Sequence, residues 1–145
     1  MSAVSLNRPV SGTALDLARV LLVNSDVASR LTLQTLLRAG GYAVDIAACA
    51  SEAFGKLDAG EYELVLSDPG MESPEAGRNV LAYAKRKDYR PATALVTAWR
   101  DSKAGPSNHV MVETEDVPSL LTKVAELIGA RAARRVERSL RLGSN

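Results

Sequence analysis

Three apolar segments of the chain end in, or are followed by, polar side chains that could form one chemical site. One segment ends at the carboxylate of Asp68, a second ends at the hydroxyl of Thr97, and a third is followed by Asn24 and Ser25. A carboxylate accepts hydrogen bonds and can hold a cation, whereas amide and hydroxyl groups both donate and accept. These side chains can act together only if the fold brings the three segment ends to one place.

The elements that would do so are short apolar runs alternating with amphipathic helical patterns. Strands that are apolar on both faces and separated by helices form a parallel sheet covered on both sides, the doubly wound α/β arrangement. Five strands favour the flavodoxin-like order 2-1-3-4-5, whose ligands bind beyond the carboxyl ends of strands 1 and 3, where Asn24, Ser25 and Asp68 would converge. We expect strands at about residues 20–23, 43–49, 62–67, 92–97 and 109–112, and helices containing residues 33–37, 51–57, 80–84 and 117–128.

The interval between the fourth and fifth strands departs from this alternation. Residues 98–108 contain Gly105-Pro106 and hardly any apolar periodicity. A crossover between parallel strands needs about a dozen residues, so we expect the fourth helix to be shortened or lost. One face of strands 4 and 5 would then be either solvated or a docking surface for a partner.

Length and composition limit the class of protein. A chain of 145 residues can bury one ordinary core, and its net charge of +1 indicates no polyanionic partner for the chain as a whole. The single cysteine, Cys49, excludes an internal disulfide, and no apolar window reaches the ~18 residues of a membrane span. The start has no signal-peptide pattern, so we expect a cytoplasmic protein without membrane contact. No glycine-rich phosphate loop or nucleophile elbow is present, which argues against an enzyme.

The order and spacing of several short motifs resemble the receiver domain of bacterial response regulators, the CheY-like fold, in an atypical form. The resemblance covers residues 19–129, which leaves residues 1–18 as a mobile lead and 130–145 as a basic extension. The motifs are Leu22-Val23-Asn24-Ser25-Asp26 with Arg30, Gly41-Tyr42-Ala43-Val44, Leu64-Val65-Leu66-Ser67-Asp68 with Met71, and Leu95-Val96-Thr97-Ala98.

The resemblance implies that Asp68 takes the place of the aspartate that accepts a phosphoryl group from a histidine kinase. The family binds Mg²⁺ with that aspartate, an acidic pair after strand 1 and a backbone carbonyl, here that of Gly70. Asn24-Ser25 replaces the acidic pair, and Glu113 replaces the usual lysine. Mg²⁺ keeps its waters unless charged oxygens compensate for dehydration. We therefore expect no resident cofactor, weak Mg²⁺ binding and slow or absent phosphorylation.

Alternatives stay open for several of these residues. Asp26 could replace the missing acid, or it could cap a helix and interact with the helix dipole. Asp68 could be a phospho-acceptor, or a carboxylate that merely binds water or caps a turn. Thr97 could be the hydroxyl that acts as a switch in the family, or it could be an ordinary β-branched residue that packs at the end of a strand. The family's partner aromatic falls near Val110, which cannot make a tyrosine's rotamer change.

The C-terminal pattern changes face after Gly129. At about 100° per residue, arginines continue the line of the preceding apolar stripe, so the helix must break at Gly129 or project as an amphipathic extension. The alternatives are a solvated or frayed tail and a partner-binding helix; nucleic acid is not expected, because no aromatic residues interleave the arginines. The candidate partner-binding residues are Arg131, Arg134, Arg135, Arg138, Val136 and Leu140.

The sequence therefore predicts a stand-alone atypical receiver that signals through protein contact and has no catalytic residues. Its partner would be a histidine kinase, another regulator or a second copy of the chain. The alternative is a working phospho-acceptor at Asp68 in a two-component phosphorelay.

Overall fold

A computed structural model of the chain describes residues 18–68, 71, 73, 75–97, 110–113 and 117–143, and only the backbone of residues 97, 110–113, 117, 142 and 143. Strands and helices alternate up to the fourth strand. The elements are β1 (Arg19–Val23), α1 (Val27–Ala39), β2 (Ala43–Ala47), α2 (Ala50–Ala59), β3 (Leu64–Ser67), α3 (Ala76–Lys85), β4 (Ala92–Thr97), β5 (Val110–Glu113) and α4 (Val117–Gly143).

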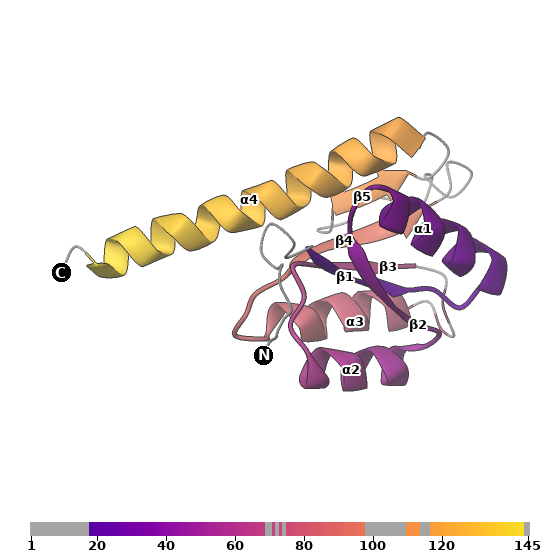
Figure 1. Ribbon diagram of the computed structural model, residues 1–145. Helices are drawn as coiled ribbons and strands as arrows, with labels where there is room; N and C mark the ends of the chain where they lie inside the picture. Colours follow the sequence, from indigo (N-terminus) through magenta and orange to yellow (C-terminus); the bar gives the residue numbers. More distant parts are fainter. Residues whose placement is uncertain are drawn as a thin grey trace, which may run out of the picture.

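The strands form one parallel sheet in the order β2-β1-β3-β4-β5, as the sequence predicts. Successive residues of a strand point to opposite faces. In β1, Leu21 and Val23 face the core formed with α2 and α3, whereas Val20 and Leu22 face the core formed with α1 and α4. Figure 1 shows these two pairs of helices on opposite sides of the sheet. The doubly wound α/β prediction is confirmed.

Some element boundaries differ from the sequence expectation. Strand β2 ends at Ala47 rather than Cys49, because Cys49 is already the N-cap of α2. The carboxylate of Glu52 accepts a hydrogen bond from the Ala48 N–H at 2.7 Å, which satisfies a backbone donor just before the helix. The predicted shortening or loss of a helix between β4 and β5 concerns residues outside the described part of the chain, as does His109.

Helix α4 continues without a break through Gly129, so of the two alternatives the structure shows the projecting helix. Its 27 residues give a length of about 40 Å. Leu120 and Val124 are fully buried against the sheet, and the later turns extend past the sheet (Figure 1). In the described part of the chain, no helix is both long and apolar enough to span a membrane.

Candidate functional site

The carboxyl ends of β1 and β3 place Asn24 and Asp68 next to each other along the sheet edge. Val23 is the register partner of Ser67, and the backbone N–H of Asp68 donates to the Val23 carbonyl at 2.9 Å. The N–H of Asn24 donates to the Ala47 carbonyl at 3.0 Å. The predicted convergence of these strand ends is thus present in the backbone, and the Asp68 side chain is half-buried there.

The side chain of Asn24 accepts a hydrogen bond within the turn in which it lies. Only 6% of Asn24 is exposed, and its Oδ1 accepts a hydrogen bond from the backbone N–H of Asp26 at 2.8 Å. The Asn24 carbonyl accepts from Nη1 of Arg30, also at 2.8 Å. This is the short-range bond that asparagine makes in turns, and it shapes the chain between β1 and α1.

Asp26 is the N-cap of α1. Its carboxylate accepts a hydrogen bond from the backbone N–H of Ser29 at 2.8 Å. The hydrogen bonds from Ser29, with a smaller contribution from the charge of Arg30, lower the pKa of Asp26 below its usual value. The helix-capping alternative for Asp26 is therefore the one that the structure shows, and neighbouring Ser25 is exposed.

These contacts allow a test of whether the edge fits Mg²⁺. The ion prefers carboxylate and phosphate oxygens in octahedral geometry and gives up water reluctantly. Here the Asn24 oxygen accepts from a backbone N–H, and the Asp26 carboxylate caps a helix. No group of three His, Cys, Asp or Glu side chains that could hold a metal occurs among the described residues. The donor set that the structure describes at this edge does not fit a magnesium site.

Two polar groups near this edge were not assigned a role from the sequence. Arg30 brings a guanidinium to the Asn24 carbonyl, and within the described residues its buried Nε has no hydrogen-bond partner. The Oγ of fully buried Ser67 likewise has none there. For Arg30, its position four residues after the helix cap was a usable signal, because residues i and i+4 lie on one helix face.

The remaining predicted site positions are described only in part. The backbones of Thr97 and Glu113 are register partners at the ends of β4 and β5. Their side chains, and Gly70 as a whole, lie outside the described residues. The proposed switch role of Thr97 and the replacement of lysine by Glu113 stay predictions.

The predicted partner-binding residues of α4 fall into two groups. Arg131, Arg134 and Arg138 line a groove between α4 and the loop that joins α3 to β4, together with Lys85 and Arg90. Val136 and Leu140 are 58% and 68% exposed, and neither they nor Arg135 line that groove. The sequence did not indicate the groove, because its walls are some 40 positions apart along the chain.

Arg131 is buried, which differs from the alternative of a solvated or frayed tail. Only 6% of Arg131 is exposed. Its guanidinium donates to the Arg90 carbonyl from Nε at 3.0 Å and to the Tyr89 carbonyl from Nη2 at 2.7 Å. These bonds tie the middle of α4 to the loop between α3 and β4.

The comparison with known proteins rests on structure. No family model matches the sequence, and no functionally curated protein matches it. A response regulator receiver protein from Sinorhizobium medicae superimposes with a TM-score of 0.67 at 20% identity, covering 81% of this chain and 98% of that one. A CheY-like receiver domain protein from Methanospirillum hungatei gives 0.64 at 25% identity, covering 82% and 99%.

NtrX from Brucella abortus gives a TM-score of 0.73 at 16% identity, covering 86% of this chain and 29% of that longer one. Together with the strand order and the position of Asp68, these similarities define the class: the chain has the fold of a response regulator receiver domain. The resemblance seen in the sequence is confirmed at the level of the fold.

Proposed function

We propose that the chain is an atypical receiver that signals through protein contact, and that Mg²⁺-dependent phosphorylation of Asp68 is slow or absent. The observation that carries the proposal is the turn after β1. There the Asn24 oxygen accepts from the Asp26 N–H and the Asp26 carboxylate accepts from the Ser29 N–H. Asn24, at the first position of the acidic pair, and Asp26, next to the second, thus shape the backbone.

The energetic argument concerns charge. A phosphoryl group adds about −1.5 to −2 charges, and phosphoryl transfer depends mainly on positioning and neutralising that charge. Arg30 brings one cation to the turn after β1. A single guanidinium bonded to a carbonyl is a poor substitute for a divalent ion bridging the donor and the acceptor. Weak Mg²⁺ binding and slow chemistry at Asp68 follow from this arrangement.

The partner would be a signalling protein, such as a histidine kinase or another regulator, or a second copy of the chain. Contact with a partner needs no catalytic residue and no resident cofactor. Such a protein would act in the cytoplasm, where kinases and regulators of this class meet. Under this proposal Asp68 marks a recognition surface at the carboxyl edge of the sheet.

The test is intact-protein mass spectrometry after incubation with acetyl phosphate and Mg²⁺. We compare the wild type, Asp68→Asn, and an Asn24→Asp/Ser25→Asp variant that restores the acidic pair. We expect no adduct on the wild type and an adduct on the restored variant, lost when Asp68→Asn is added. An Asp68-dependent adduct forming rapidly on the wild type would overturn the proposal.

A working phospho-acceptor is the second candidate, and one observation favours it. Asp68 directly follows the end of β3, the position expected of a phospho-acceptor, and its N–H donates a hydrogen bond to the Val23 carbonyl. In that case a partner's cationic or acidic groups would complete the site. Mass gain would then require a kinase as well as the small donor, and it would disappear in Asp68→Asn.

A further inference from the structure

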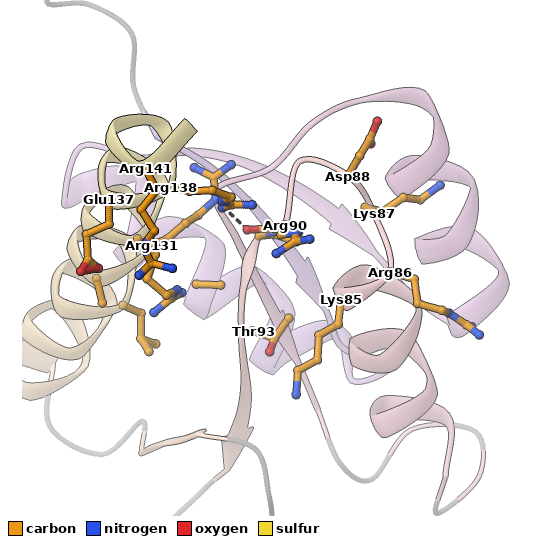
Figure 2. Close-up of a pocket in the computed structure, with 15 residues that line it drawn as sticks. Lys85, Arg86, Lys87, Asp88, Arg90, Thr93, Arg131, Glu137, Arg138 and Arg141 are labelled. Carbon is orange, nitrogen blue, oxygen red and sulfur yellow. Dashed lines mark hydrogen bonds between the residues drawn. The ribbon is translucent and has the colours of Figure 1, made fainter. Parts of the chain in front are cut away.

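A strongly cationic groove lies far from Asp68 on the same domain. It has a volume of about 940 Å³ and separates the C-terminal half of α4 from the loop between α3 and β4 (Figure 2). Ala92 and Thr93, the first residues of β4, are among its lining residues. Because all strands are parallel, the groove is at the amino edge of the sheet, opposite the edge that carries Asp68.

The residues that line the groove carry a much higher formal charge than the chain as a whole. Eight of its 15 lining residues are Lys or Arg and two are Asp or Glu, a formal charge of +6. The whole chain has a net charge of +1. The remainder of the protein is therefore net acidic, and the positive potential is gathered at this one place.

Two of the eight cations interact with residues outside the groove: Arg86 lies 5.8 Å from the centre of the Tyr83 ring, and Lys87 forms an ion pair with Asp58. The other six are Lys85 and Arg90 on the loop side, and Arg131, Arg134, Arg138 and Arg141 on α4. Of these, Arg131 already donates to the Arg90 and Tyr89 carbonyls, so Arg134 and Arg138 are the α4 cations on which the proposal depends. In Figure 2, Glu137 lies on α4 and Lys85 lies on the opposite wall of the groove.

The arginines of α4 form a row because they recur at helical spacing. Positions 131, 134, 138 and 141 share one helix face and span about 15 Å. In the described part of the chain, neither Arg134 nor Arg138 forms an ion pair with a carboxylate. Such a row is repulsive until an anion binds, since like charges at this spacing destabilise a helix.

The loop opposite this row is held in place by Arg131. Arg90 has a φ of 43°, in the left-handed region that a residue with a side chain rarely adopts. The bonds from Arg131 to the Arg90 and Tyr89 carbonyls hold that conformation. Burial and then repulsion from Arg135 lower the pKa of Arg131. The loop wall is therefore fixed before any ligand binds, which reduces the ordering cost of binding.

We propose that this groove binds a linear chain of phosphate groups, supplied either by inorganic polyphosphate or by the phosphate tail of a nucleotide. Guanidinium groups match phosphate oxygens in pairs, and a row of them matches a row of phosphates. None of the described residues that line the groove is aromatic, so this lining offers neither a stacking platform for bases nor an aromatic anchor for a peptide. Its volume is in the range of small-ligand pockets, roughly 300–1,000 Å³.

The experiment is isothermal titration of the full chain with sodium tripolyphosphate and, separately, with ATP, in about 0.15 M salt. The groove variant is Arg134→Gln/Arg138→Gln. The matched control is Arg78→Gln/Arg135→Gln, which removes the same charge from exposed positions outside the groove. Thermal melts of both variants establish that each is folded.

We expect saturable binding of tripolyphosphate, weakened roughly tenfold or more in the groove variant and nearly unchanged in the control. ATP binding of similar strength would show that the phosphate tail of a nucleotide can fill the groove, tighter ATP binding would assign the ligand to nucleotides, and much weaker ATP binding would assign it to inorganic polyphosphate. No binding to either probe, or equal losses in both variants, would overturn the proposal. Tighter binding of duplex DNA or polyglutamate than of tripolyphosphate would overturn it too.

Discussion

Substitution of Arg131 is the sharpest test of how α4 is attached to the domain. The Arg131→Met change keeps an unbranched apolar stem in a site that is only 6% exposed. It removes the two hydrogen bonds to the Arg90 and Tyr89 carbonyls. One of these bonds is to the carbonyl of Arg90, whose φ of 43° is then held by fewer contacts. The structure therefore predicts a loss of stability larger than that of any surface arginine.

The magnitude follows from those two bonds. A hydrogen bond to a charged group contributes about 1.5–3 kcal/mol, and a buried carbonyl left without a partner costs about 1–3 kcal/mol. Water can reach part of the opened site, so we expect the free energy of unfolding to fall by about 2–4 kcal/mol. For a domain of this size that lowers the melting temperature by roughly 5–15 °C.

The assay is urea unfolding followed by far-ultraviolet circular dichroism, with Arg135→Met as the matched control. Arg135 is exposed on the same helix, so its replacement should change stability by no more than about 0.5 kcal/mol. Arg131→Lys should fall between the two, because an ammonium group cannot reproduce the two-pronged geometry of a guanidinium. Equal stabilities for Arg131→Met and Arg135→Met would refute the attachment described here.

Three further changes test other parts of the fold. Asp26→Ala removes the N-cap of α1 and should cost about 1 kcal/mol, whereas Asp26→Ser should restore most of it in the same unfolding assay. Ser67→Ala removes a buried hydroxyl that has no partner among the described residues, so stability should stay equal or rise by up to about 1 kcal/mol; a clear loss would show that the hydroxyl is bonded. Hydrogen bonds from Tyr62 and Arg19 lower the pKa of Asp45 below 3.8. The ionised carboxylate thus stabilises the fold above that pH, and the stability gap to Asp45→Asn should close as the pH falls through the lower native pKa; a gap independent of pH would contradict this.

The sequence predicted best what depends on local pattern. The alternation of apolar strands and amphipathic helices was enough for the parallel sheet and its strand order, since few topologies satisfy such a pattern. The capping role of Asp26 was also accessible, because the donor Ser29 is three residues away. The position of Asp68 followed from the end of its strand.

What the sequence could not supply were contacts between distant segments. Arg131 is a charged residue on the helix face that is apolar in the preceding turns. By pattern alone, this change indicates a helix that extends away from the domain. The partners of Arg131 are backbone carbonyls about 40 positions earlier, and carbonyls carry no sequence signal. The sequence could not predict the cationic groove for the same reason, because Lys85 and Arg90 lie next to α4 only in the folded chain.

Helix α4 is the element that connects the two edges of the sheet. It begins at Val117, shortly after β5 ends at the edge that carries Asp68, and its later turns line the groove at the other edge. Leu120 and Val124 anchor its first half in the core, and Arg131 ties its second half to the Arg90 and Tyr89 carbonyls. We therefore expect the second half to detach more readily than the first, without unfolding of the sheet. Loss of Arg131 would abolish the groove and leave the geometry around Asp68 intact, so the activities proposed for the two edges are separable by a single substitution.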